Sequence, residues 1–291
     1  MSLQTAIFRF MCTCSDKKRD AGLTPPENIG FLDNIAYGPD KKYHLLDIYR
    51  PKNVSGKLPV IVNFHGGGWV YGTKETYRWY CMSLAEQGFA VVNPSYRLAP
   101  RYRFPAAFRD INGVFGFVLK HAGEYGFDTD RIIGIGDSAG ATGMAVYAAV
   151  LTNPGLAARF PVKVPEKLKL CALGLNCGRY RAAGCAADYA VLLPKENPDE
   201  VLQMLHVPDH ITPAYPPCHL MTAEGDSMKD EQQIMTEALE RNGVRYTLKI
   251  YGNEQNPPGH VFHCNIREET AKQANRDQLG FFRRCLKSHE E

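Results

Sequence analysis

Gly136-Asp137-Ser138-Ala139-Gly140 is the stretch that decides the fold of this chain of 291 residues. Residues 131–135 before it form an apolar run that predicts a buried strand, and residues 139–151 after it predict a helix rich in small side chains. A serine between two glycines at such a junction lies on a tight, strained turn that holds its hydroxyl above the sheet. A side chain at either glycine would collide with the neighbouring strand or helix, so the turn requires both glycines.

Strands and helices alternate along the rest of the chain. Residues 35–49 predict an antiparallel pair of strands, and the alternation begins after it with the continuous apolar run of residues 58–64. The further predicted strands are 89–94, 168–175, 218–223 and 246–251, and the further predicted helices are 74–87, 105–122, 230–242 and 267–286. This order predicts an α/β fold, with a mostly parallel central sheet of about eight strands and helices on both faces, in a single domain of residues 1–291.

Two segments do not fit the alternation. Residues 178–217 contain six prolines and one weak helix, at residues 199–205. Near the N-terminus, a short helix would place four side chains on one apolar face: Ile7, Phe8, Phe10 and Met11. Because an insertion of this length between core strands usually serves function, we expect residues 178–217, together with residues 1–30, to form a small cap over the active site.

Composition and charge narrow the class of protein. Apolar residues make up 44% of the chain and charged residues 22%, with a net charge of +3, as in an ordinary soluble globular protein. The short basic clusters at residues 17–19 and 283–284 are typical of a solvated surface, so we expect no nucleic-acid partner. No apolar run approaches the roughly 18 residues of a membrane span, and residues 1–11 lack the basic and long apolar regions of a signal peptide.

The chain contains nine cysteines, an odd number, without the paired spacing of a metal site. Cys12 and Cys14 are too close together to form a useful disulfide. We therefore expect mostly reduced thiols, a cytoplasmic protein and no bound metal.

A second glycine-rich stretch, His65-Gly66-Gly67-Gly68-Trp69, directly follows the predicted strand 58–64. Three glycines after a buried strand allow the backbone to approach a ligand closely and to present bare N–H groups. We predict that the N–H groups of Gly67 and Gly68, together with that of Ala139 at the start of a helix, form an oxyanion hole. His65 is predicted to have a structural role in anchoring this loop.

A nucleophilic serine requires a histidine as its base, and in the chain order Ser, Asp or Glu, His the base comes last. Six histidines follow Ser138: His206, His210, His219, His260, His263 and His289. His260 follows Pro257-Pro258-Gly259 in the loop after the last predicted strand, which is the position expected of the base. His263, three residues further on, is the alternative.

The base in turn requires a carboxylate that orients it. Ala223-Glu224-Gly225-Asp226 ends the predicted strand 218–223, and a carboxylate at the carboxyl end of a parallel strand faces the crevice in which ligands bind. Asp226 is the predicted acid. Glu224 lies one step too early, and Asp230 and Glu231 are expected to interact with the dipole of the following helix.

These motifs together resemble the hormone-sensitive-lipase family of α/β-hydrolases over nearly the whole chain, residues 35–282. The sequence motifs that carry the resemblance are His65-Gly66-Gly67-Gly68, Tyr96-Arg97-Leu98-Ala99-Pro100, Phe104-Pro105-Ala106-Ala107, Asp128-Thr129-Asp130-Arg131-Ile132, the elbow around Ser138, Ala223-Glu224-Gly225-Asp226 and His260-Val261-Phe262. The departures are Arg101 where the family commonly has Glu, Cys177 in a segment without the usual Tyr-Pro, Val261 in place of Gly, and a short cap. The family includes acetylesterases that act on sugars and hydrolases of lipid-type and aryl esters, so it leaves the substrate open.

The residues and the resemblance lead to one expected activity. We expect a serine carboxylesterase that hydrolyses short-chain acyl esters, most simply acetyl esters, through a Ser138-His260-Asp226 triad and an acyl-enzyme. Trp69 and Tyr71 are expected to contact this small-molecule substrate, and no cofactor is implied. The alternatives are an amidase or deformylase on the same triad, and a non-catalytic small-molecule receptor on a hydrolase fold. Whether the chain forms a homodimer is left open.

Overall fold

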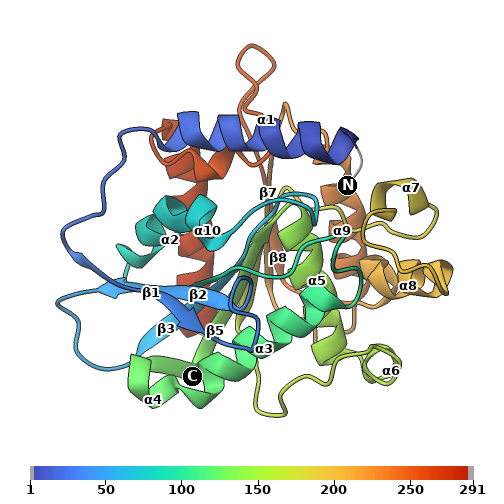
Figure 1. Ribbon diagram of the computed structural model, residues 1–291, viewed down its shortest axis with the longest axis horizontal. Helices are drawn as coiled ribbons and strands as arrows, with labels where there is room; N and C mark the ends of the chain where they lie inside the picture. The colour runs from blue at the N-terminus through green and yellow to red at the C-terminus, as the bar shows by residue number, and fades with distance from the viewer. Residues whose placement is uncertain (1–2, 288–291) are drawn as a thin grey trace.

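An eight-stranded sheet forms the centre of the structure, a computed structural model that describes residues 3–287 (Figure 1). Its strands lie in the order β1-β2-β4-β3-β5-β6-β7-β8. β2 is antiparallel to both β1 and β4, and the other neighbouring pairs are parallel. The strands are β1 (Ile29–Ala36), β2 (Leu45–Pro51), β3 (Leu58–Phe64), β4 (Ala90–Pro94), β5 (Phe127–Asp137), β6 (Ala172–Asn176), β7 (Cys218–Ala223) and β8 (Tyr246–Tyr251). The ends of the predicted domain, residues 1–2 and 288–291, lie outside the described residues.

Helices cover both faces of this sheet. Val60 and Ile61 are neighbours in β3 and point to opposite faces, because side chains alternate along a strand. Val60 belongs to the core under α3, α5 and α9, whereas Ile61 belongs to the core under α2 and α10. The helices are α1 (Leu3–Asp20), η1 (Lys74–Tyr77), α2 (Arg78–Ala85), α3 (Ala106–Lys120), α4 (Ala122–Tyr125), α5 (Ala139–Thr152), α6 (Pro154–Ala157), α7 (Ala186–Tyr189), α8 (Pro198–Leu205), η2 (Val207–Asp209), α9 (Lys229–Arg241), η3 (Phe262–Cys264) and α10 (Glu269–Lys287). The predicted mostly parallel sheet with helices on both faces is confirmed.

Some elements have bounds that differ from the predicted ones, for identifiable reasons. β5 begins at Phe127 because its first residues already pair with the start of β3. The predicted strand 168–175 shortens at its start, because the N–H of Leu168 turns back to the carbonyl of Pro165. The predicted helix 74–87 divides into the 3-10 turn η1 and the helix α2.

The turn between β5 and α5 holds Ser138 at φ 51° and ψ −121°. A positive φ in a residue other than glycine is strained and persists only where the surroundings enforce it. A Cβ on Gly136 would lie 2.5 Å from the backbone of Gly140, and a Cβ on Gly140 would lie 1.8 Å from the carbonyl oxygen of Phe64. The predicted collisions at both glycines are therefore present, and the turn excludes any larger residue.

The two segments expected to form a cap lie near the carboxyl ends of the parallel strands. α1 runs across the top of the molecule in Figure 1, and it is much longer than the short helix expected there. No residue of α1 is buried. The segment 178–217 forms α7, α8, η2 and their connecting loops at one side of the same edge (Figure 1).

Two general features of the described residues bear on the predictions from composition. Within residues 3–287, a hydrophobic helix of the length needed to span a bilayer is not found. All nine cysteines lie in this part of the chain and carry free thiols.

We expect the substitution Gly140→Ala to destabilise the fold by at least about 3 kcal/mol, because the new Cβ would meet backbone atoms that cannot move aside. The matched control is Gly116→Ala in α3, where a Cβ meets nothing within 4 Å and alanine favours the helix by about 1 kcal/mol. Urea unfolding of the two variants and the parent protein measures the difference. Equal stabilities of the two variants would contradict the close contact at the elbow.

Candidate active site

Ser138 is fixed at the start of α5 by backbone hydrogen bonds on both of its sides. Its N–H donates to the carbonyl oxygen of Asn176 at the end of β6, at 2.9 Å. Its own carbonyl oxygen accepts the N–H of Thr142, at 3.1 Å. These bonds hold the strained turn in place and leave the hydroxyl free to contact the neighbouring loops.

His260 reaches Ser138 from the loop between β8 and η3. Its Nε2 lies 2.9 Å from Ser138 Oγ, and its Nδ1 lies 2.8 Å from Asp226 Oδ1. The structure therefore brings the three residues of the predicted triad together in one hydrogen-bonded row. A serine hydroxyl, an imidazole and a carboxylate in this order can transfer a proton away from the hydroxyl as it attacks a carbonyl.

Asp226 is a buried carboxylate whose two oxygens are both hydrogen-bonded. Thr222 Oγ1 donates to Oδ2 and the N–H of Met228 donates to Oδ1, each at 2.8 Å. Burial by itself raises the pKa of Asp226, but the hydrogen bond and charge of His260 outweigh it and lower that pKa to about 2. Asp226 is thus ionised at neutral pH and accepts the N–H of His260 Nδ1. This leaves His260 Nε2 as the acceptor for the Ser138 hydroxyl.

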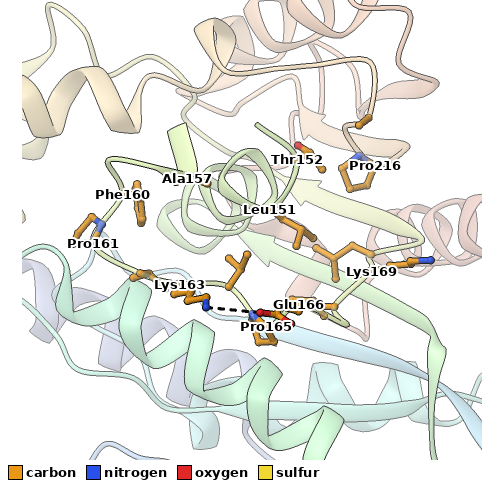
Figure 2. Close-up of a pocket in the computed structure, with 15 residues that line it drawn as sticks. Leu151, Thr152, Ala157, Phe160, Pro161, Lys163, Pro165, Glu166, Lys169 and Pro216 are labelled. Carbon is orange, nitrogen blue, oxygen red and sulfur yellow. Dashed lines mark ion pairs between the residues drawn. The ribbon is translucent and has the colours of Figure 1, made fainter. Parts of the chain in front are cut away.

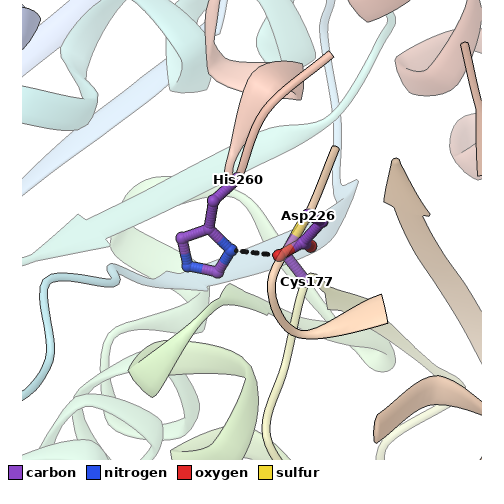
Figure 3. A group of neighbouring side chains, drawn as sticks. All are labelled: Cys177, Asp226 and His260. Carbon is purple, nitrogen blue, oxygen red and sulfur yellow. Dashed lines mark hydrogen bonds and ion pairs between the residues drawn. The ribbon is translucent and has the colours of Figure 1, made fainter. Parts of the chain in front are cut away.

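Cys177 is a further neighbour of Asp226 (Figure 3). Cys177, Asp226 and His260 offer ligand atoms within 4.8 Å of one another, a grouping that could hold a metal ion. Burial raises the pKa of the Cys177 thiol well above its usual value, so the thiol keeps its proton and can donate it to Asp226. Because both nitrogens of His260 are also engaged, hydrogen bonding accounts for this grouping.

The glycine loop of residues 65–68 is held against the elbow by buried polar groups. The N–H of Gly66 donates to Asp137 Oδ1 at 3.1 Å, and the Tyr77 hydroxyl donates to Asp137 Oδ2 at 2.7 Å. Burial raises the pKa of Asp137 to about 6. Asp137 occupies the first variable position of the elbow motif Gly-x-Ser-x-Gly, so the motif could have identified it as a residue of this junction. Nothing in the sequence marked Tyr77 as its partner.

His65 is buried below this loop and does not line the pocket at Ser138. Its ring stacks on Tyr96 with the ring centroids 4.1 Å apart, and its Nδ1 lies 2.8 Å from the carbonyl oxygen of Gly66. The Tyr96 hydroxyl donates to the His65 carbonyl at 2.8 Å. These contacts fit the anchoring role predicted for His65.

Gly67, Gly68 and Ala139, the predicted oxyanion-hole residues, line the pockets that Ser138 also lines. Gly67 and Gly68 line one pocket at Ser138, and Gly68 and Ala139 line another. Within the part of the chain that the structure describes, the N–H groups of these three residues have no hydrogen-bond acceptor. Gly67 adopts φ 111°, and a Cβ there would lie 2.3 Å from the carbonyl oxygen of Tyr71, so only glycine fits. The three donors are available to an oxygen that gains negative charge.

Ser138 lies between two pockets of unequal size. The larger pocket has a volume of about 580 Å³ and is bounded by α1, the glycine loop and the loop that carries His260. The smaller pocket has a volume of about 160 Å³ and lies between the glycine loop, the start of α5 and residues 179–189. Gly68, Ser138 and Met228 line both pockets. A substrate attacked by Ser138 can therefore place its two parts in separate spaces.

Trp69 and Tyr71, the residues expected to contact the substrate, border different pockets. Trp69 lines the smaller pocket and also packs on Phe108, with ring centroids 5.7 Å apart. Tyr71 lines the larger pocket, and its hydroxyl donates to Asp16 of α1 at 2.7 Å. Both side chains are thus within reach of a bound molecule, while each also has a packing or hydrogen-bonding role.

The residues considered as alternatives to the triad lie elsewhere. His263 is fully buried and lines neither pocket at Ser138. Burial lowers the pKa of His263 to about 3, so its ring is neutral. Glu224 and Glu231 are each held in an ion pair, and Asp230 is exposed at the start of α9.

A separate pocket of about 730 Å³ lies away from Ser138, beside the end of α5 and residues 157–170 (Figure 2). Its walls are mostly apolar and include Leu151, Phe160 and Pro216. Lys163 and Glu166 pair at its exposed edge, 3.7 Å apart. Because no residue of the triad or of the glycine loop lines this pocket, it is not part of the site at Ser138 despite its larger volume.

Comparisons with known proteins point in one direction. A family model described as BD-FAE matches residues 46–160. The chain is 28% identical to a versiconal hemiacetal acetate esterase of Dothistroma septosporum, over 76% of this chain and 72% of that protein. It is also 28% identical to an arylesterase of Saccharolobus solfataricus, over 76% and 77% of the two chains. The crystal structure of esterase B from Lactobacillus rhamnosis superposes with a TM-score of 0.89 at 25% identity, covering 99% of this chain and 95% of that one.

The buried histidines of the molecule imply a stability that decreases in acid. Burial lowers the pKa of His65 and of His219 to about 4 and that of His263 to about 3, from a usual value of 6.5. At pH values between the pKa of a histidine in the folded chain and its usual pKa, the unfolded chain binds a proton that the folded chain does not. The free energy of unfolding therefore falls as the pH falls, by about 1.4 kcal/mol per pH unit for each histidine. The raised pKa of Asp137 has the opposite sign and offsets one of the three contributions below about pH 6.

We therefore expect urea unfolding to show a loss of about 4 kcal/mol between about pH 7 and about pH 5. Circular dichroism monitors the unfolding, and the activity plays no part in the measurement. A free energy of unfolding that stays constant or increases over this interval would contradict the neutral state of the three buried rings.

Proposed function

We propose that Ser138 is the nucleophile of this chain, a carboxylic ester hydrolase that is similar to the hormone-sensitive-lipase family of α/β-hydrolases. One observation carries the proposal: Ser138 Oγ, His260 and Asp226 form a continuous hydrogen-bonded row with steps of 2.9 Å and 2.8 Å. The strained backbone of Ser138 supports it, since strain of this kind persists where function requires it.

In the first half of the reaction, Ser138 Oγ bonds to the ester carbonyl carbon while its proton moves to His260 Nε2. Asp226 stabilises the imidazolium that forms. The carbonyl oxygen becomes an oxyanion that accepts hydrogen bonds from the N–H groups of Gly67, Gly68 and Ala139. A single donor of this kind contributes about 3–4 kcal/mol to the transition state.

The oxyanion then collapses, the bond to the alcohol oxygen breaks, and His260 returns its proton to the leaving alcohol. A water molecule attacks the acyl-enzyme in the same way, with His260 Nε2 accepting its proton. The second tetrahedral intermediate releases the carboxylic acid and restores Ser138. The reaction as proposed uses no cofactor.

We propose that the smaller pocket binds the acyl group and that this group is short, most simply acetyl. A volume of about 160 Å³ holds only a few carbon atoms. Arg179 and Asp188 form an ion pair that lines this pocket, and a long acyl chain would have to displace the water around it. A relative whose name describes an acetate esterase supports the same assignment. The larger pocket would then bind the alcohol portion.

The expected cap and the cellular location are proposals that rest on fewer observations. α1 contributes Phe8, Asp16 and Arg19 to the larger pocket, and the segment 178–217 contributes residues to the smaller one, which supports a cap built from both segments. The odd number of cysteines supports a protein of the reducing cytoplasm. Formation of a homodimer stays a prediction.

Replacement of Ser138 by alanine should reduce kcat for an activated acetyl ester by about 10⁴–10⁶-fold, because the acyl-enzyme can no longer form. The matched control is Ser227→Ala, which removes another hydroxyl from the lining of the same pocket. Circular dichroism checks that both variants are folded. If folded Ser138→Ala keeps a tenth of the activity, or if Ser227→Ala loses as much, the assignment of the nucleophile is wrong.

The size of the smaller pocket predicts the acyl-chain preference. Across p-nitrophenyl esters from acetate to decanoate, kcat/KM should be greatest at about two to four carbons. Trp69→Phe, which widens the smaller pocket, should move the optimum to longer chains, whereas Tyr71→Phe in the larger pocket should not. A maximum at eight carbons or more in the parent protein, or an unchanged optimum in Trp69→Phe, would show that the acyl group binds elsewhere.

A further inference from the structure

α1 is a surface helix, and several of its apolar side chains point away from the protein. Four of them are between 50% and 76% exposed: Leu3, Ile7, Phe10 and Met11. A surface helix ordinarily turns its apolar side chains toward the core and its charged side chains toward water. The sequence pattern of α1 therefore predicts a buried apolar face, and the structure shows that this face is open.

The opposite side of α1 is attached to the protein through polar groups. Arg9 Nε donates to the carbonyl oxygen of Val70 at 2.7 Å, and Asp16 accepts the Tyr71 hydroxyl at 2.7 Å. Arg19 donates to the carbonyl oxygen of Thr76 at 2.7 Å, near the C-terminal end of the helix. These contacts fix which side of α1 faces the protein, so the exposure of the apolar residues is a property of the packed helix.

The outward face of α1 is apolar over most of its length and carries lysines near the C-terminal end of the helix. At roughly 100° per residue, the outward residues share one arc about 120° wide, and they are Leu3, Ile7, Phe10, Met11, Cys14, Lys17 and Lys18. Lys17 and Lys18 are exposed. The two acidic residues of α1, Asp16 and Asp20, lie off this arc and are paired with Arg19. The outward face of the described helix is therefore apolar and basic, without a carboxylate.

We propose that this outward face of α1, which we call the α1 outer face, binds the surface of an anionic phospholipid bilayer. A helix with an apolar face and lysines beside it lies in the plane of the lipid headgroups, with its apolar side chains reaching the acyl chains. Lysines close to the surface add attraction to anionic headgroups, and they do so without any specific contact. The inference concerns adsorption to the surface and does not depend on the proposed reaction.

The dimensions of α1 argue for a bilayer rather than for a second copy of this chain. Its 18 residues span about 27 Å, and a strip about 10 Å wide gives roughly 270 Å² of contact. A stable protein interface needs about 800 Å² from each partner. A bilayer has no such minimum, because it deforms around the inserted side chains and supplies charge opposite to Lys17 and Lys18.

Adsorption through this face would bring the mouth of the larger pocket close to the lipid. Phe8 and Ser15, at one border of the α1 outer face, line that pocket together with Ser138. Molecules held in the lipid would thus meet the pocket without first crossing bulk water.

The test is flotation of the full chain with vesicles of phosphatidylcholine, alone or mixed with phosphatidylserine. We expect binding to the mixed vesicles to be at least about tenfold tighter and to weaken as salt is added. Phe10→Ser combined with Met11→Ser should weaken it by at least about tenfold. Lys17→Gln combined with Lys18→Gln should remove the preference for phosphatidylserine. The matched control, Phe31→Ser combined with Leu32→Ser in β1, changes two side chains that are 46% and 50% exposed and should bind as the parent does.

Two results would overturn the proposal. One is equal flotation of the parent and the Phe10→Ser/Met11→Ser variant, with circular dichroism showing both to be folded. The other is light scattering that shows the parent to be a dimer and the same variant to be a monomer, with neither binding vesicles, because the α1 outer face would then be a contact between proteins. Neither readout uses ester hydrolysis, so a failure here is distinct from a failure of the proposed mechanism.

Discussion

The close approach of two backbone segments, the start of α5 and the end of β3, is the constraint on which the rest of the site depends. Gly140 lies so near the carbonyl oxygen of Phe64 that a methyl group has no room, and a methyl group on Gly66 would meet the side chain and the carbonyl oxygen of Asp137. Pressing the two segments together places Ser138 beside the N–H groups that follow Phe64. The same contact explains why the polar pair of Asp137 and Tyr77 is buried at this junction, where it joins one loop to the other.

The three side chains in contact come from the segments that follow three different strands, β5, β7 and β8. Parallel strands bring their carboxyl ends to one edge, so residues far apart in the chain meet there without a long connection between them. Asp226 is the most constrained of the three, since four neighbouring groups bond to it or stand beside it. Its low pKa results from this surrounding and not from its position in the sequence. The geometry of the site is therefore a property of the sheet edge as much as of the individual residues.

The sequence predicted those features that depend on local chemistry. The elbow glycines, the glycine loop and the alternation of strands and helices could be identified because each leaves a pattern within a few residues. Cys177 beside Asp226 and Tyr77 beside Asp137 could not, because those contacts join residues distant in the chain. α1 shows a different limit: its apolar residues recur with helical spacing, but the pattern does not say whether the face they form is covered.

In the reaction proposed for Ser138, the unequal spaces on its two sides would also select one face of the substrate carbonyl. A planar carbonyl carbon has two faces, and a nucleophile that can approach from only one side selects between them. When the larger group of a molecule is excluded from the smaller space, the carbonyl can enter in one orientation, and only one of its faces meets Ser138 Oγ. A tetrahedral phosphorus centre with four different substituents would for the same reason react as one of its two mirror-image forms.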